Sequence, residues 1–406
     1  MKLFSYLTAI LFALALTFTS ATQLRLSGLP IGVGELLLVS WLLLIPFEFI
    51  RIEHISITTV TRWTCGFWYL SFLFLLIGFW IGIAEGLWDT TGFHDITAYL
   101  FISVLFITLS MIHPPSLYMK VAAKWFLIFS FMILIFIYLL AQLTSSLGPI
   151  SFWYWDRFTG WSTNPNQLAL HITVSLWICG YYLLTTSDMI RKIGYFIMVV
   201  CLAWVGWSTK SDSLLISSIS SISLYVTVRL IMGKEQTPLL PKTSVVARWV
   251  RYLLVIVVAS TVCILLYQPV MSQVESIYND GHQGSLRFLL WGNGLSAIAA
   301  SPLFGAGPGA HSGRGGPFEG FEAHNTLIDW GGSAGILGVL VLVALYVYWT
   351  YVCWRANQLY LLVSLLMIFQ FSFFHYVLRQ PIFWFLMTWV MTVSISKARE
   401  LNQKVC

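Results

Sequence analysis

Long apolar stretches dominate the chain and alternate with short polar segments. Stretches of about 17 to 25 apolar residues are long enough to cross a bilayer as α-helices. They lie near residues 4–22, 29–50, 64–84, 96–113, 120–142, 164–185, 190–208, 211–231, 249–270, 327–351, 358–376 and 380–397. The pattern predicts an all-α polytopic membrane protein with about 12 transmembrane helices, forming a single integral membrane domain over residues 1–406.

The composition agrees with this interpretation and excludes some function classes. Hydrophobic residues make up 58% of the chain and charged residues only 9%, far from the composition of soluble domains. The net charge of +6 is spread over short loops, so we exclude nucleic-acid binding. The 6 Cys residues show no C-x-x-C spacing, so neither a metal site nor a disulfide framework is predicted. Residues 1–23 resemble a cleavable signal peptide, yet they are long enough to span a bilayer, and we favour an uncleaved first helix.

The distribution of basic residues predicts the orientation. With the N-terminus inside, 16 of the 22 Lys and Arg residues fall on the inner side and 6 on the outer side. Cytoplasmic loops of membrane proteins carry such an excess. Both termini are therefore predicted to be cytoplasmic.

The same assignment gathers polar residues at the outer ends of the spans. They are Glu35, Asp89, His94, Asp95, Asp156, Arg157, Asn164, Asn166, His171, Lys210, Asp212, Arg287, His324, Asn325, Asp329, His375 and Arg379. Polar groups are tolerated better at the ends of spans than at the midplane. Any chemistry is therefore predicted to occur at the outer leaflet.

One outer loop, residues 271–326, is long for a compact membrane domain, which indicates a functional role. Its part 285–301 predicts an amphipathic helix, either lying at the interface or packed against the bundle. Residues 302–320 are rich in Gly and Pro, which permits close backbone approach. They match neither a Walker loop nor a dinucleotide fingerprint. This segment is either a flexible lid or tether, or its amides and Arg314 hold an anionic diphosphate.

His324 and Asn325 stand where this loop meets the tenth predicted span. They form either a polar pair in which Asn325 caps the helix, or a site in which His324 acts as a general base near neutral pH. Asp329 lies about one and a half turns along the helix, and its ability to orient the imidazole is left open.

Other polar residues also have a structural and a functional interpretation. Arg287 is either a solvated interfacial cation or a guanidinium that binds phosphate through paired donors. Lys210 and Asp212 share a tight turn and either neutralise each other or take part in binding. His171 lies inside a span, where a packed, hydrogen-bonded histidine is the favoured interpretation.

Four segments together resemble the O-antigen ligase and O-antigen polymerase superfamily of bacterial envelope glycosyltransferases. They are "FTGWSTNPNQLALHI" (158–172), "STKSDSLL" (208–215), "SLRFLLWGNGLSAIAASPLFGAGPGAH" (285–311) and "AHNTLIDWGGSAGILGVL" (323–340). The resemblance covers residues 158–345 and includes the layout of spans around a large outer loop.

The resemblance implies transfer of a glycan from an undecaprenyl diphosphate carrier to lipid A core or to another carrier-linked glycan. It implies no cofactor, nucleotide sugar or metal, and it places the protein in the bacterial inner membrane with a periplasmic active site. His324 occupies the family's His-Asn position and is implied as the catalytic base, while Arg287 is implied to bind the diphosphate. The residues predicted to bind substrate are Arg287, Asn325, Lys210, Arg314, Arg379 and Asp329.

The sequence departs from the family at one turn, where Ser-Arg is common and this chain has Ser211 and Asp212. Lys210 is one candidate for the missing charge, and Arg379 or Arg157 are others. Two further function classes stay open. A transporter or flippase of a lipid-linked glycan would also have about 12 spans, and a non-catalytic scaffold would tolerate replacement of His324 and Arg287.

Overall fold

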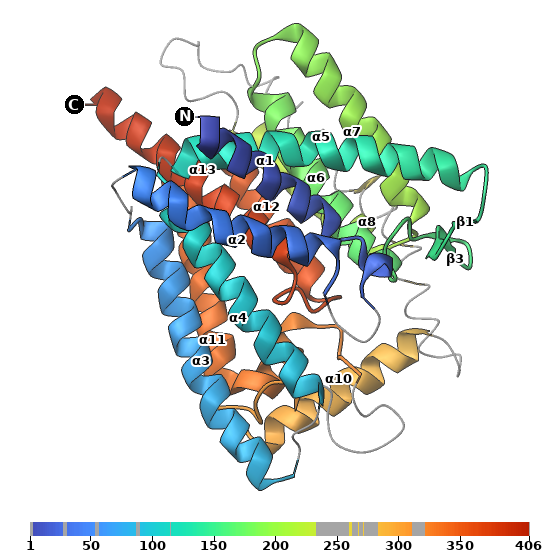
Figure 1. Ribbon diagram of the computed structural model, residues 1–406, viewed down its shortest axis with the longest axis vertical. Coiled ribbons are helices and arrows are strands. Elements are labelled where there is room, and N and C mark those ends of the chain that lie inside the picture. Colours follow the sequence, from blue (N-terminus) through green and yellow to red (C-terminus); the bar gives the residue numbers. More distant parts are fainter. Residues whose placement is uncertain are drawn as a thin grey trace.

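Figure 1 shows the computed structural model of the chain as a bundle of long helices that cross at several angles. The structure describes residues 3–26, 31–52, 57–86, 90–113, 115–232, 260–261, 267, 271, 283–310 and 321–405. The first and last described helices, α1 (Leu3–Phe18) and α13 (Pro381–Val405), end near each other on one side. Helix α10 (Gln283–Ala300) lies on the opposite side. The placement of the termini and of the site relative to the membrane stays a prediction.

Most of the described residues are helical, which confirms the all-α polytopic fold. The remaining helices are α2 (Val33–Ile52), α3 (Thr59–Ala84), α4 (Thr90–Met111), α5 (Pro115–Ala141), α6 (Pro165–Thr185), α7 (Met189–Ser208), α8 (Asp212–Met232), α11 (Thr326–Arg355) and α12 (Leu359–Ser372). Among the described residues, 9 helices are long and apolar enough to cross a membrane, and α1 and α12 are shorter apolar helices. Every predicted span coincides with a helix except the one near 249–270, which falls almost entirely outside the described residues.

Two small antiparallel hairpins follow α5, which the apolar pattern did not predict. Strand β1 (Ser146–Leu147) pairs with β2 (Ile150–Ser151), and β3 (Trp153–Tyr154) pairs with β4 (Arg157–Phe158). Figure 1 shows both hairpins beyond the end of α5, away from the two termini. Strands of two residues carry no alternating pattern long enough to read from sequence. The second hairpin positions Arg157.

Aromatic side chains fill the centre of the bundle, between α3, α11 and α13. Trp330 and Trp384 are fully or almost fully buried. Phe67 contacts both of them, at 6.3 Å and 5.3 Å between ring centroids. Such rings bury large apolar areas and prefer tilted or offset contacts. The core therefore ties the helix that follows His324 to the last helix of the chain.

The beginning of the glycine-rich segment is packed against a break in α11. Gly335 has φ 68° and ψ −175° within that helix, and the freed N–H of Ile336 donates to the carbonyl of Pro302 at 2.8 Å. A Cβ on Gly335 would lie 2.2 Å from the carbonyl oxygen of Leu303, and a Cβ on Gly78 of α3 would lie 2.6 Å from that of Phe304. The predicted close backbone approach is found here. Residues 302–310 thus form a packed strap, and residues 311–320, with Arg314, lie outside the described residues.

Candidate active site

A small pocket lies beside the N-terminus of α11 and next to a larger groove. The pocket has a volume of about 70 Å³ and is lined by Asn164, Asn166, Gln167, Leu170, Glu322, His324, His375, Tyr376, Arg379 and Gln380. The groove has a volume of about 650 Å³ and is lined by Thr19, Arg25, Ile31, Glu35, Leu36, Val39, His94, Thr97, Ala98, Phe101, Ile102, Gln167, Glu322, Arg379, Gln380 and Pro381. Since Gln167, Glu322, Arg379 and Gln380 line both, the two cavities adjoin.

His324 is held in an unusual backbone conformation directly before α11. Its φ is 53°, in the left-handed region that non-glycine residues seldom adopt. Asn325 is the N-cap of the helix, and its side-chain oxygen accepts the N–H groups of Leu327 and Ile328 at 3.0 Å and 3.3 Å. The imidazole of His324 stays 40% exposed. The cap therefore begins the helix at Thr326 and leaves His324 at the pocket.

His375 is brought to the same pocket by the connection between α12 and α13. The hydroxyl of Thr326 donates to the carbonyl of His375 and accepts the N–H of Val377 at 3.1 Å. The rings of His324 and His375 lie 6.0 Å apart, edge to face. The Nε2 atom of His375 is buried and has no hydrogen-bond partner in the structure. Two imidazoles thus line one cavity.

Two arginines, Arg157 and Arg287, lie near the histidines without lining the pocket. Arg157 on β4 donates to the Thr209 carbonyl at 3.0 Å and to the Asn166 side chain at 2.7 Å. Arg157 and Arg287 interact electrostatically with each other and with Asp212, at the start of α8. Burial lowers the pKa of both guanidiniums and Asp212 opposes this shift. Both stay charged at neutral pH, given the high intrinsic pKa of Arg.

Burial and these cations keep the histidines neutral. Burial lowers the pKa of His324, and the charge of Arg287 lowers it further. Burial lowers the pKa of His375 well below its ordinary value, and electrostatic interaction with His324, Arg287 and Arg157 lowers it further. A neutral imidazole is a proton acceptor. The pocket therefore combines proton acceptors with fixed positive charge.

Arg379 occupies the wall between pocket and groove. Its guanidinium forms ion pairs with Asp95 of α4 and with Glu322, and it lies over the Tyr376 ring at 4.9 Å from the centroid. Its positive charge is therefore shared between two carboxylates. The prediction that Arg379 binds substrate stays a prediction.

The structure corrects the interpretation that Lys210 and Asp212 neutralise each other. Lys210 has φ 48° and forms an ion pair with Asp156 in the second hairpin, whereas Asp212 interacts with Arg157 and Arg287. The turn thus points the lysine toward solvent and the aspartate toward the arginines. Across the described ranges, no group of three His, Cys, Asp or Glu side chains suited to a metal ion is found, and metal independence stays a prediction.

The sequence pattern predicts no role for Glu322, and it places His375 among the outer polar residues without a specific role. Glu322 stands two residues before His324, and His375 stands four residues before Arg379. This proximity to residues already singled out was the available signal. His171, in contrast, is packed inside α6 and shares a hydrogen bond of 2.9 Å with Ser130, as the favoured interpretation predicted.

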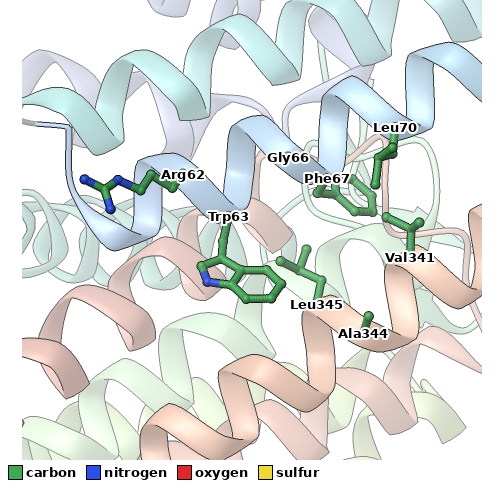
Figure 2. A pocket seen from close by; sticks show the side chains of 8 residues that line it. All are labelled: Arg62, Trp63, Gly66, Phe67, Leu70, Val341, Ala344 and Leu345. Atoms are coloured by element: carbon green, nitrogen blue, oxygen red, sulfur yellow. The ribbon is translucent and has the colours of Figure 1, made fainter.

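A third cavity, of about 250 Å³, lies between α3 and α11 and is not part of this site. Figure 2 shows its lining residues, Arg62, Trp63, Gly66, Phe67, Leu70, Val341, Ala344 and Leu345. Leu345 lies about 30 Å along α11 from the start of that helix, at 1.5 Å per residue, so this end of the cavity is far from His324. Apart from Arg62 the lining is uncharged. This cavity therefore offers no carboxylate or imidazole that could act as a general acid or base.

Comparison with known proteins identifies the segment that carries much of this site. Residues 196–343 match the family model Wzy_C, described as O-antigen ligase. The match includes Lys210, Asp212, Arg287, His324 and Asp329, whereas Arg157, His375 and Arg379 lie outside it. No curated protein matches the chain. The match over residues 196–343 confirms the resemblance to the O-antigen ligase and polymerase superfamily.

Proposed function

We propose that this protein transfers a glycan from an undecaprenyl diphosphate carrier to an acceptor hydroxyl at the periplasmic face of the inner membrane. The observation that carries the proposal is a pair of neutral histidines that line one pocket, close enough to Arg157 and Arg287 to feel their charge. The family match supports glycan transfer in O-antigen biosynthesis. The identity of the donor, the catalytic role of the histidine and the face of the membrane go beyond the family match and are part of the proposal.

His324 acts as the general base. Its neutral imidazole accepts the proton of the acceptor hydroxyl while the hydroxyl oxygen bonds to the anomeric carbon of the donor sugar. The bond between that carbon and the diphosphate oxygen breaks, and its electron pair leaves with the diphosphate. Attack from the opposite side inverts the anomeric centre. The pocket's contribution is to align these groups and to receive one proton.

Arg287 and Arg157 stabilise the leaving diphosphate. Negative charge grows on the departing oxygen, and preorganised guanidiniums lower its energy. Arg157 is held by Thr209 and Asn166, which fixes its planar donors in advance. We therefore assign to Arg157 the cationic role for which Lys210 and Arg379 were the other candidates. Asn325 and Asp329 act by shaping the backbone around His324.

The larger groove provides a place for the lipid part of the donor. One part of its lining is apolar, with Leu36 and Val39 from α2 and Phe101 and Ile102 from α4. At Arg379 and Glu322 it meets the small pocket. A polyprenyl chain lying in this groove has its diphosphate beside the histidines and arginines. The amphipathic lining thus matches an amphipathic substrate.

The experiment that tests the proposal uses the purified wild-type protein in nanodiscs with an undecaprenyl diphosphate oligosaccharide. Three reactions are compared: one with lipid A core as acceptor, one with a second carrier-linked oligosaccharide, and one without acceptor. Glycan moved to lipid A core identifies a ligase, and glycan moved to the carrier-linked oligosaccharide identifies a polymerase. If no acceptor is glycosylated and, in liposomes, the carrier-linked glycan crosses the bilayer, the protein is a flippase and the proposal is wrong.

A further inference from the structure

Glu322 contacts the candidate base and the Arg379 guanidinium through different oxygens. Its Oε2 lies 3.9 Å from Nδ1 of His324, and its Oε1 forms the ion pair with Arg379. The Glu322 side chain is 25% exposed, against 40% for that of His324. One carboxylate therefore joins the imidazole to a buried charge network.

Arg379 fixes this carboxylate to the bundle. Its other ion-pair partner, Asp95, has a fully buried side chain on α4. Asp95 also accepts the N–H of Gly309, in the packed strap, at 3.2 Å. A planar guanidinium can hold two carboxylates at once in a fixed geometry. Glu322 lies in the irregular segment before α11. Through Arg379 of the α12–α13 connection it is linked to Asp95 of α4, and through Asp95 to the strap.

The position of this carboxylate has a chemical consequence for the imidazole. A neutral imidazole carries one N–H, and a carboxylate on the Nδ1 side attracts the proton to that nitrogen and leaves the Nε2 lone pair free. The other charged or titratable groups near His324 do not have this effect. Arg287 on α10 repels an imidazolium, and His375 is kept neutral. Arg157 and Asp212 interact with Arg287, and Asp329 accepts backbone N–H groups.

We infer that Glu322, held by Arg379 and Asp95, is a positioning residue that fixes the His324 tautomer and balances the imidazolium formed during glycan transfer. This inference rests on the proposed function. Glu322 and Arg379 also line both the groove and the pocket. The positioning unit therefore stands where the lipid-linked donor meets the base.

The first test is a comparison of Glu322→Gln with wild type, alone and combined with His324→Ala. Glutamine keeps the shape and removes the charge, so we expect kcat to fall roughly 10-fold or more, because general-base catalysis contributes about 10²–10⁴-fold. In the His324→Ala background the same change should have no further effect, since Glu322 acts through His324. The matched control is Glu85→Gln, an exposed carboxylate at the C-cap of α3, which should transfer glycan like wild type.

The second test needs no glycan substrate. Diethyl pyrocarbonate modifies neutral imidazoles, so peptide mass spectrometry gives the pH midpoint at which His324 becomes reactive. Loss of the Glu322 charge makes the imidazolium less stable, so the midpoint should move to lower pH in Glu322→Gln. Loss of the Arg287 charge in Arg287→Gln should move it to higher pH. Glu85→Gln should leave it in place.

These outcomes separate the inference from the proposed function. Wild type that moves no glycan contradicts the proposed function, and the modification midpoint still decides the role of Glu322. An unchanged midpoint in Glu322→Gln contradicts the inference, as does wild-type kcat in that variant. An equal loss of transfer with and without His324 also contradicts it, because a merely structural role would behave in that way.

Discussion

The carboxylate of Asp329 binds the backbone on both sides of His324. Its Oδ1 accepts the N–H of Ala323 at 2.7 Å, and its Oδ2 accepts the N–H of Asn325 at 3.1 Å. The histidine between them has a left-handed φ of 53°, a conformation that costs free energy and needs support from its surroundings. Asp329 therefore sets the position of the His324 backbone and leaves the orientation of the ring to other groups.

Replacing Asp329 with Asn should damage both stability and transfer. Asparagine offers one acceptor oxygen, so one of the two buried N–H groups loses its partner, which costs about 1–3 kcal/mol. We expect a lower Tm together with a lower kcat, measured by thermal unfolding and by glycan transfer. Asp188→Asn is the matched control, because Asp188 caps α7 through its side chain and asparagine caps equally well. Wild-type Tm and kcat in Asp329→Asn would show that the two hydrogen bonds are unimportant.

Arg157 should matter more for donor binding than Lys210. Arg157 is half-buried, is held by two hydrogen bonds and interacts with Arg287. Lys210, in contrast, pairs with an exposed Asp156, and solvent-exposed ion pairs contribute little. We expect Arg157→Lys to raise the Kd for an undecaprenyl diphosphate oligosaccharide several-fold more than Lys210→Gln does. Equal effects, or a larger effect of Lys210→Gln, would return the phosphate role to the lysine.

The packed strap should depend on glycine at one position of α3 and tolerate alanine at another. A Cβ on Gly78 would meet the Phe304 carbonyl oxygen at 2.6 Å, while one on Gly66 finds no neighbour within 4 Å. Alanine in a helix is otherwise favoured over glycine by about 0.5–1 kcal/mol. We expect Gly78→Ala to lower Tm and Gly66→Ala to leave it unchanged or raise it. A Tm in Gly78→Ala as high as in Gly66→Ala would mean that the strap is not seated on α3.

The helices were predictable because membrane spans must be long, apolar and internally hydrogen-bonded. The predicted amphipathic helix at 285–301 coincides with α10, and the Asn325 cap follows from local chemistry. These features depend on neighbouring residues in the chain. The sequence therefore sufficed for the fold class, for the extent of α10 and for the start of α11.

The pocket depends on contacts between distant residues, which a single sequence does not reveal. Nothing near Glu322 indicates that its carboxylate meets Arg379, or that Arg379 reaches Asp95 across the bundle. Arg157 lies near Arg287 and Asp212 because it belongs to the second short hairpin after α5, which the apolar pattern does not predict. The predicted residues therefore included His324 and Arg287, while the groups that hold and balance them became visible only in the structure.

In the proposed function, His324 and Arg287 act together to move a glycan off its carrier. The most direct measurement is single-turnover transfer from an undecaprenyl diphosphate oligosaccharide in nanodiscs, with donor Kd measured in parallel. His113→Ala, at an exposed histidine, is the control variant. We expect His324→Ala to bind donor but to transfer glycan about 10²–10⁴-fold more slowly than wild type, and Arg287→Ala to lose both donor binding and transfer. Transfer at the wild-type rate by His324→Ala would contradict the role of His324 as general base.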